Sequence, residues 1–492
     1  MHDLPFDNSY ARLGPHFYSR QLPEPVPEPG LIRVNRPLAR HLGIDPDWLE
    51  SETGVGFMAG NHVPANADPV ATVYGGHQFG NWVPQLGDGR AILIGELVAA
   101  DGERYDIQLK GSGRTPYSRG GDGRAPLGPV LREYIVSEAM AALGVPTTRA
   151  LGAVTTGETV FRETRLPGAV LTRVARSHIR IGTFEYFAAQ GDREALDVLA
   201  QHVIERHYPE AAQVEQPVVA MLEGVLERQA ELIARWQSLG FIHGVMNTDN
   251  MLLSGETIDY GPCAFMDGFD NDAVFSSIDH GGRYAYRNQA HIAHWNLARL
   301  AQALLPLIDD DHDRAIEKGQ AVINTFPGQV QSAYRSAMLR KLGLGAARPG
   351  DGELIRNLLE LMQASHSDFT LAFRRLWELA AGDEREGDSI AAVFDFDKAF
   401  EPWLRSWRQR FADDPADATT RLAAMQVANP AFIPRNHLVE KTIAAAVTGP
   451  DFEPFHALVG ALENPFVFHI PLTHLATPPK PGQEVTQTFC GT

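Results

Sequence analysis

Cysteine and long apolar runs are scarce in this sequence. Its 492 residues contain only two cysteines, Cys263 and Cys490, which excludes a disulfide framework and a cysteine-only zinc site. No run approaches the ~18 apolar residues that a membrane-spanning helix requires, and residues 1–30 have no continuous apolar segment behind a basic start. We therefore expect a cytoplasmic protein that has no membrane partner.

Basic residues are also in deficit. Lys and Arg number 43 against 61 Asp and Glu, which gives a formal net charge of −18. Because nucleic acids are held mainly by a surplus of Lys and Arg, this balance argues against a nucleic-acid partner. Any phosphate must therefore be bound in a local basic pocket. The hydrophobic share of 44% and the charged share of 21% are typical of a globular chain.

Familiar phosphate-binding glycine motifs are missing as well. The sequence has no Gly-Lys-Ser/Thr of a Walker loop, and no G-x-G-x-x-G follows a strand convincingly. Gly87 and Gly89 form a tight turn before a strand, with Arg90 at its mouth. As a bare pattern this turn is more typical of a structural hairpin, whereas the glycine-rich loop 111–123 fits a nucleotide-contacting loop and a plain linker equally well.

What the sequence does have is a loop typical of protein kinases with the usual base missing. In the kinase pattern His-Arg-Asp-x-x-x-x-Asn, the Asp accepts a proton and the Asn binds a metal, and a later Asp-Phe-Gly binds metal too. Here the loop HGVMNTDNMLL starts at His243, and Val245 replaces that Asp. Asn250 keeps its offset, Asp249 offers a displaced carboxylate, and Asp259 begins an Asp-Tyr-Gly. The hard oxygen ligands for magnesium or manganese remain, while the base has moved.

The hydrophobic pattern predicts strands followed by helices. Residues 91–110 alternate as two strands around an Ala-Asp-Gly-Glu turn, a helix follows at about 128–143, and 158–174 again forms strands. The strongest helical periodicity runs from Pro217 to Leu239 and ends at a glycine just before the loop that starts at His243. Further helices are expected at 291–305, 314–342, 351–380 and 389–412.

This order predicts an α+β fold with the two lobes of a protein kinase. We expect an N-terminal extension at 1–70, a strand-rich kinase-like N-terminal lobe at 71–190 and a helical kinase-like C-terminal lobe with its own extension at 191–470. A flexible Pro-rich tail completes the chain at 471–492.

Two groups of charged residues fit a polyphosphate pocket. Lys110 on a strand and Glu133 on the next helix could form an ion pair that positions phosphates, although alone they fit a solvated surface better. The loop after His243 reverses that preference. Arg173 and Arg180, with Arg176 between them, fit either a solvated basic patch or bidentate phosphate contacts. A zinc site is disfavoured for three histidines that lack a His-Glu-x-x-His pattern: His280, His291 and His294.

Four motifs and the terminal Cys-Gly-Thr together resemble one known family specifically. The motifs are YGGHQFGNWVPQLGDGRA at 74–91, DIQLKGSGRTPYSRGGDGRAPLGPVLREY at 106–134, HGVMNTDNM at 243–251 and DYGPCAFMD at 259–267. In this order they resemble the SelO (YdiU) family of pseudokinase-fold protein nucleotidyltransferases over essentially the whole chain. The resemblance implies that ATP binds flipped relative to ordinary kinases and that AMP is transferred to a Ser, Thr or Tyr hydroxyl of a protein. It also implies UMP transfer with manganese as a second activity.

The resemblance assigns roles to residues that match the motifs. Asp249 becomes the proton acceptor, Asn250 and Asp259 become ligands of Mg²⁺ or Mn²⁺, and Glu133 tethers Lys110. In AMP transfer pyrophosphate leaves, so basic groups must hold the β- and γ-phosphates deep in the pocket. The implied nucleotide contacts are Gly87, Gly89, Arg90, Lys110, Asp122, Gly123, Arg173, Arg180 and Asp259.

The resemblance also implies a redox element. Family members in eukaryotes often carry selenocysteine third from the end, where this chain has Cys490, and Cys263 follows closely after Asp259. We predict a reversible, regulatory disulfide between these cysteines, with thiol-redox proteins as partners; two unrelated thiols are the alternative.

Two other function classes stay open at this point. The chain could be an ordinary phosphotransferase that uses Asp249 as its base, which the valine at 245 disfavours. It could also be a nucleotide-binding scaffold without turnover, which the retained metal ligands disfavour.

Overall fold

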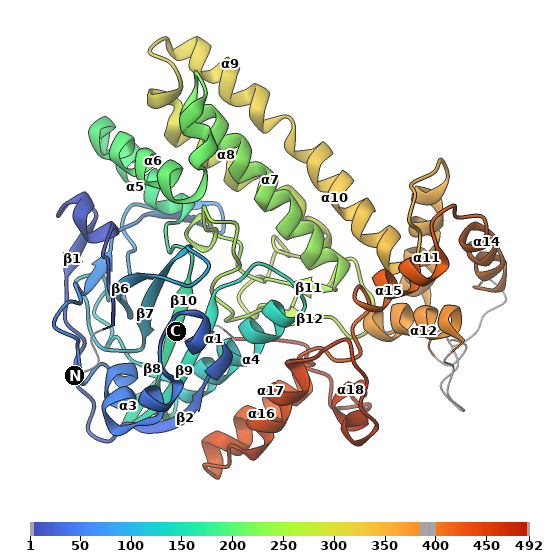
Figure 1. The fold of residues 1–492 in the computed structure, drawn as a ribbon, viewed down its shortest axis with the longest axis horizontal. Helices are drawn as coiled ribbons and strands as arrows, with labels where there is room; N and C mark the ends of the chain where they lie inside the picture. Colours follow the sequence, from blue (N-terminus) through green and yellow to red (C-terminus); the bar gives the residue numbers. More distant parts are fainter. Residues whose placement is uncertain (1–3, 383–392, 394–399, 490–492) are drawn as a thin grey trace.

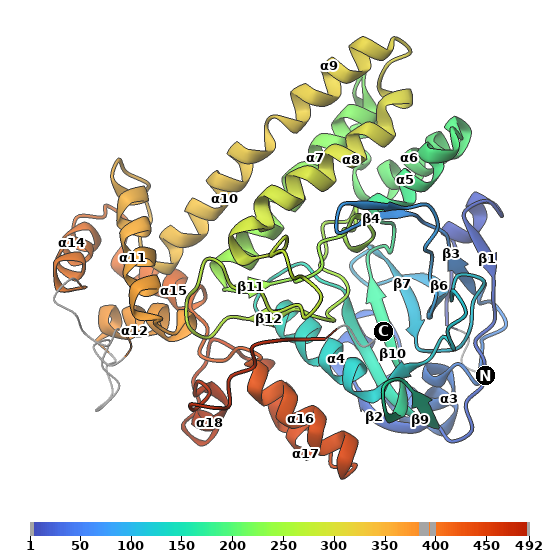
Figure 2. The same ribbon diagram turned by 180° about the vertical axis from the view of Figure 1, so that it is seen from behind.

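The computed structural model describes residues 4–382, 393 and 400–489, and Cys490 lies outside them. The chain combines one large antiparallel sheet in its N-terminal part with a helical C-terminal part, as Figures 1 and 2 show. This is an α+β architecture. The lobes of a protein kinase remain a prediction. Within the described residues, no helix is both long and apolar enough to cross a bilayer.

The large sheet has the strand order β1-β3-β6-β7-β10-β9-β2, and β8 pairs with β10. Two separate two-stranded sheets, β4–β5 and β11–β12, stand apart from it. Because β1 and β2 come from residues 1–70, the predicted extension shares a sheet with the predicted N-terminal lobe, and the boundary at 70 stays a prediction. The strands are β1 (Tyr18–Arg20), β2 (Gly30–Val34), β3 (Val70–Thr72), β4 (Gly76–Gln78), β5 (Asn81–Val83), β6 (Ala91–Val98), β7 (Arg104–Lys110), β8 (Ala125–Pro126), β9 (Arg149–Phe161), β10 (Arg165–Ala175), β11 (Phe241–Ile242) and β12 (Ala264–Phe265).

Alternation along the strands decides which side chains reach the site. Leu109 and Val170 pack with α1 (Arg36–His41), α2 (Pro46–Glu50) and α3 (Glu52–Ala59) on one face of the sheet. Leu171 packs with α4 (Leu127–Ala142) on the other face. Side chains alternate between the two faces of a strand. Lys110 follows Leu109 and Arg173 precedes Val174, so both lie on the α4 face.

The helix α4 lies across that face and brings Glu133 to the sheet. Leu131, Ile135 and Ala139 are buried at helical spacing, and Gly144 ends the helix with a left-handed φ of 77°. On its other side, α4 packs against α16 (Asn436–Thr448) and α17 (Glu453–Leu462), as Figure 1 shows. Glu133 is therefore buried between the helix and the strands, so its carboxylate must be paired there.

The helix α7 (Pro217–Ser238) connects the helical part to the site. Its buried face includes Leu222, Val225, Ile233 and Trp236, as the periodicity predicts, and the chain then enters β11. Figures 1 and 2 show α7 to α10 side by side, with α11, α12, α14 and α15 beyond the end of α10. The other helices here are α5 (Ile181–Gln190), α6 (Arg193–His207), α8 (Gln289–Ile308), α9 (His312–Ile323), α10 (Phe326–Lys341), α11 (Asp351–Ser365), α12 (Phe369–Ala381), α14 (Phe400–Ala412), α15 (Ala418–Gln426) and α18 (Thr473–Ala476).

Two predicted helices are each divided in the structure. The segment 314–342 forms α9 and α10, because Pro327 fits only the first turn of a new helix. The segment 351–380 forms α11 and α12, because His366 has a left-handed φ of 48° and Asp368 then caps α12 through the amide of Leu371. For 389–412, α14 begins at Phe400, and most of the earlier part lies outside the described residues.

Candidate functional site

Asp259 lies at the centre of a cluster of three cations. Its backbone is left-handed with φ 64°, in the turn after the loop that starts at His243. Oδ1 lies 3.2 Å from Lys110 Nζ and 2.8 Å from Arg173 Nη2, and Oδ2 lies 3.1 Å from Arg180 Nη1. Burial alone raises the pKa of Asp259, but Arg173, Lys110 and Arg180 outweigh burial and hold that pKa well below its usual value. The carboxylate is therefore ionised and held in place.

Glu133 ties two of these cations to the sheet. The predicted ion pair with Lys110 Nζ is present, and Arg173 Nε donates to Glu133 Oε1 at 2.7 Å. Arg173 Nη1 also donates to Gln108 Oε1 at 3.2 Å, from the residue opposite it in the β7–β10 register. Burial raises the pKa of Glu133, yet Arg173 and Lys110 bring that pKa below its usual value. Lys110 and Arg173 consequently present fixed positive charge to Asp259.

His243 holds the loop rather than taking part in chemistry. It is fully buried and stacks on Trp236 at 5.3 Å between ring centroids. Its Nε2 lies 2.8 Å from the carbonyl oxygen of Ile258, and its Nδ1 lies 3.3 Å from the amide nitrogen of Val245. A neutral ring that donates from Nε2 and accepts at Nδ1 satisfies both contacts. Burial lowers its pKa, which favours that neutral form.

Asn250 and Asp259 are the predicted metal ligands. Asn250 Nδ2 donates to the carbonyl oxygen of Val245 at 3.0 Å, which leaves the amide oxygen as its ligand atom. One amide oxygen and one carboxylate suit magnesium or manganese completed by phosphate and water oxygens. In the part of the chain that the structure describes, no group of three or more His, Cys, Asp or Glu side chains could hold a metal. A metal at this place would thus need phosphate oxygens of the nucleotide to complete its ligands.

Asp249 has the properties expected of a base. Burial raises its pKa to about 6, despite the opposing charge of Arg180, which also donates to the Asp249 carbonyl oxygen. Oδ2 accepts from Gln78 Nε2 at 3.2 Å, and Oδ1 is enclosed without a hydrogen-bond partner in the described part of the chain. One oxygen is therefore oriented, and the carboxylate keeps capacity to accept a proton.

The β4–β5 hairpin is fastened to this loop. The amide of His77 donates to Thr248 Oγ1 at 2.7 Å, and the amide of Phe79 donates to Asn247 Oδ1 at 3.0 Å. Gly76 lies so close that an added Cβ would be 3.0 Å from the Oδ1 of Asp249. The hairpin therefore holds the loop segment that contains Asp249.

Sequence reasoning missed three residues that complete the site. They are Gln78, which donates to Asp249, Tyr74, whose ring lies 4.6 Å from Arg180 Cζ, and Asp88, whose Oδ1 lies 3.8 Å from Arg180 Nη2. All three lie within the motif at 74–91. That motif suggested a region, but no spacing rule connects these side chains to Arg180 or Asp249, because the fold alone brings them together.

The predicted glycines are required by local packing. At Gly87, with φ 83°, an added Cβ would lie 2.4 Å from the ring of Tyr117, and at Gly123 it would lie 1.9 Å from a backbone oxygen. At Gly89 it would lie 2.8 Å from the Tyr117 carbonyl oxygen. Arg90 precedes β6, whose Ala91 pairs with Lys110. Contact of these residues with a nucleotide stays a prediction.

Two predicted charged residues are engaged outside the cluster. Asp122 pairs with both terminal nitrogens of Arg162, at 2.8 and 3.0 Å, and this bond lowers the pKa of Asp122. Arg176 pairs with Glu103, so only Arg173 and Arg180 of the arginine group reach Asp259. A nucleotide contact for Asp122 would require a change in its pairing with Arg162.

Cys263 is not exposed in this structure. Its thiol is fully buried, Sγ lies 3.5 Å from the Tyr260 carbonyl oxygen, and burial raises its pKa to about 12. The tail nevertheless comes close, because Thr488 Oγ1 donates to the Pro262 carbonyl oxygen at 2.6 Å. The bond to Cys490 stays a prediction, since Cys490 lies outside the described residues.

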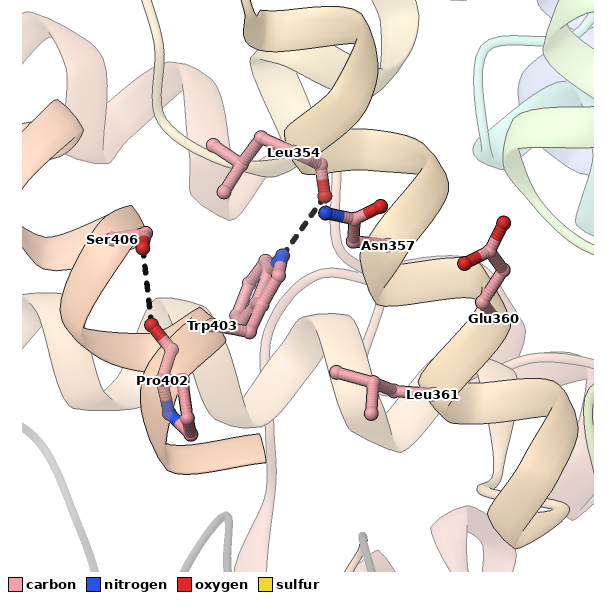
Figure 3. A pocket seen from close by; sticks show the side chains of 7 residues that line it. All are labelled: Leu354, Asn357, Glu360, Leu361, Pro402, Trp403 and Ser406. Atoms are coloured by element: carbon pink, nitrogen blue, oxygen red, sulfur yellow. Dashed lines mark hydrogen bonds between the residues drawn. The ribbon is translucent and has the colours of Figure 1, made fainter. Parts of the chain in front are cut away.

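Two cavities lie away from the Asp259 cluster. One, of about 410 Å³, lies between α11 and α14, where Figure 3 shows Trp403 donating to the Leu354 carbonyl oxygen. Its lining contains Glu360 but neither Lys nor Arg, so it offers no cation for a phosphate. The other, of about 740 Å³, lies between α10 and the start of α11, and its lining includes Arg335, Arg348 and Glu353.

Comparisons with known proteins identify the family of this chain. A family model described as "Protein adenylyltransferase SelO" matches residues 1–463. A protein from Rhodopseudomonas palustris (strain BisB18), named "Protein nucleotidyltransferase YdiU", is 59% identical over 99% of both chains. Proteins of the same name from Methylorubrum extorquens (strain PA1) and Bradyrhizobium diazoefficiens are each 57% identical, again over 99% of both chains.

Proposed function

Because the chain belongs to the SelO family of protein adenylyltransferases and is a nucleotidyltransferase, we propose that it transfers AMP from ATP to Ser, Thr or Tyr hydroxyls of other proteins. One observation carries this proposal. Asp259 is surrounded by Lys110, Arg173 and Arg180, while Asp249 supplies the carboxylate that position 245 lacks. The proposal includes a kinase-like bilobal fold, which the Lys110–Glu133 pair supports.

The proposed reaction is a displacement at the α-phosphorus. The substrate hydroxyl oxygen forms a bond to that phosphorus, the bond to the β-phosphate bridging oxygen breaks, and pyrophosphate leaves with the bond electrons. The hydroxyl proton passes to Asp249. Lys110, Arg173 and Arg180 stabilise the charge that develops on the leaving pyrophosphate. This arrangement requires ATP to bind flipped, with its β- and γ-phosphates toward the three cations.

Asn250 and Asp259 would hold Mg²⁺ or Mn²⁺ together with phosphate oxygens. The bound metal supplies Lewis-acid stabilisation of phosphate charge. The chain's own contribution is to keep Asp259 ionised through its three cations and to orient Asn250 through its bond to the Val245 carbonyl oxygen.

A second proposed activity is UMP transfer from UTP with manganese, because the phosphate contacts do not distinguish one nucleobase from another. Two alternatives to nucleotide transfer would be recognised by their products. An ordinary phosphotransferase would need Asp249 to serve the γ-phosphate, and a scaffold would give no product. Intact-mass analysis of bacterial extract proteins after incubation with ATP or UTP and metal should reveal a nucleotidyl increment. A phosphate increment, or none, would contradict the proposal.

Removing the phosphate-binding cations should weaken transfer more than removing an exposed arginine. Each lost charge-assisted contact costs ~1.5–3 kcal/mol, so Lys110→Ala and Arg180→Ala should each lower kcat/KM for ATP by about 10- to 100-fold. Arg356→Ala is the control, since Arg356 is 61% exposed and lies 3.8 Å from its partner carboxylates. Equal losses in all three variants would place the pocket elsewhere.

We also propose that Cys263 and Cys490 form a reversible disulfide that lowers activity, with a thiol-redox protein as the two-electron partner. The docking of Thr488 on Pro262 supports it. The burial of Cys263 means that the loop must open before its thiol reacts.

Reduction should therefore activate the oxidised enzyme. Dithiothreitol should raise transfer after mild oxidation, and Cys490→Ser should make transfer insensitive to it. Non-reducing peptide mapping should recover the two cysteines as one linked peptide. Recovery of both as free thiols, with activity unchanged by reductant, would remove this proposal and leave nucleotide transfer unaffected.

The proposal also covers the partners and the location of the protein. Protein substrates, and neither nucleic acid nor membrane, are the expected partners, and the cytoplasm is the expected location. The net charge of −18 supports the exclusion of nucleic acid.

A further inference from the structure

We propose that Arg283 and Arg299 form a docking site for an acidic side chain of the protein substrate, close to the hydroxyl that is modified. The inference rests on the proposed function and adds a substrate class to it. Both guanidinium groups face one ring, that of Trp295 on α8, with Cζ at 5.0 Å from the ring centroid for Arg283 and 5.1 Å for Arg299. Each guanidinium thus contacts the same ring, and both arginine side chains are half-buried.

Neither arginine has an acidic partner in the described part of the chain. Many arginines of this protein form ion pairs, including those around Asp259, but no carboxylate of the described residues lies within 4.0 Å of a nitrogen of Arg283 or Arg299. Within the same residues, the Nε of each is enclosed and has no hydrogen-bond partner. Arg283 has a bond to the Tyr284 side chain, which leaves its charge uncompensated. The site can therefore accept an anion.

Two carboxylates lie near the arginines without forming an ion pair with them in the described part of the chain. Glu185 is buried, has its Oε1 at 2.6 Å from His77 Nδ1, and interacts electrostatically with Arg299 from a distance. Asp279 accepts from the backbone amides of Arg283 and Tyr284, at 2.9 and 2.8 Å. Both reduce the local positive charge, but neither is bonded to a guanidinium group. In a chain of net charge −18, two such arginines on one tryptophan favour an acidic ligand.

The β4–β5 hairpin links this site to the base. The guanidinium of Arg283 would lie 3.5 Å from a Cβ added at Gly80, at the hairpin turn. Gln78, two residues earlier, donates to Asp249. Since extended chain advances about 3.3 Å per residue, the anion site lies on the order of 10 Å from the base. An acidic residue one to three positions from the target hydroxyl could reach it. Trp82 on the same hairpin is 37% exposed and could contact the intervening residues.

Peptide binding tests the inference without requiring turnover. The probes are fluorescein-labelled peptides that carry Ser, Thr and Tyr with Glu at flanking positions, and matched peptides with Gln at those positions. Fluorescence anisotropy should show that the full chain binds the Glu peptides about tenfold more tightly at low salt and that high salt removes the difference. Arg283→Gln and Arg299→Gln should each remove most of that preference. Arg283→Lys, which keeps the positive charge, should retain part of it. Arg287→Gln is the control, because Arg287 is 61% exposed on the same loop and pairs with Asp272.

The outcomes separate the two proposals. Equal binding of Glu and Gln peptides, or equal loss in the Arg287 control, would overturn the docking site. Charge-dependent binding without AMP transfer to any peptide would keep the docking site and count against the proposed function. AMP transfer that does not depend on the flanking charge would support the proposed function and count against the docking site. Where transfer occurs, Arg283→Gln should raise KM for the Glu peptide about tenfold while KM for ATP stays unchanged.

Discussion

Asp259→Asn should lower nucleotide transfer by ~10³-fold. The Asp259 carboxylate pairs with three cations and is the proposed ligand of a metal. The asparagine amide carries no charge and is a weaker metal ligand. Loss of a metal's Lewis-acid stabilisation costs several kcal/mol, and each 1.36 kcal/mol is tenfold in rate. Transfer of label from ATP to extract proteins at saturating Mg²⁺ or Mn²⁺ measures the effect.

The control for this prediction is Asp272→Asn. Asp272 is a surface aspartate, 61% exposed and paired with Arg287, so its loss should change transfer little. Thermal unfolding should show that both variants are folded. A folded Asp259→Asn enzyme with more than a tenth of the wild-type rate would rule out Asp259 as a metal ligand.

Asp249→Asn should lower kcat by ~10²- to 10⁴-fold, the range for loss of a general base. The reason is that the amide cannot take the hydroxyl proton, although it can still accept the hydrogen bond from Gln78. Because burial raises the pKa of Asp249 to about 6, wild-type activity should rise with pH up to about 6 and level off above it. A base acts in its deprotonated form, so the rate should fall about tenfold per pH unit below that pKa.

The matched control is Asp310→Asn, at an aspartate that is 85% exposed. It should keep both the rate and the pH profile of the wild type. An Asp249→Asn variant that retains the rise near pH 6 would show that another group titrates, and near-normal kcat would remove Asp249 as the base.

The sequence predicted the parts of the site that local patterns specify. Lys110 and Glu133 were expected to meet because one lies on a strand face and the other on the next helix, and the ion pair is present. Arg173 and Arg180 reach Asp259, whereas Arg176 between them pairs with Glu103. The alternation of β10 explains part of this outcome, since it turns Arg173 toward α4.

Contacts between distant segments could not be predicted in this way. The bond from Gln78 to Asp249 joins the β4–β5 hairpin to a loop far along the chain, and only the fold brings them together. The resemblance assigns Asp122 to the nucleotide, and no local pattern predicts its pairing with Arg162, which follows the end of β9. The division of 314–342 at Pro327 could have been predicted, because proline is disfavoured inside a helix.

The position of the transferred phosphorus is the central claim, and doubly labelled ATP tests it most directly. ATP that carries distinguishable labels on its α- and γ-phosphates would be incubated with the full chain, metal and bacterial extract proteins, with Asp249→Asn and Asp259→Asn in parallel. We predict that protein will retain the α-label without the γ-label and that both variants will lose it. Retention of the γ-label on protein, with no α-label, would make the chain an ordinary kinase and contradict the flipped nucleotide.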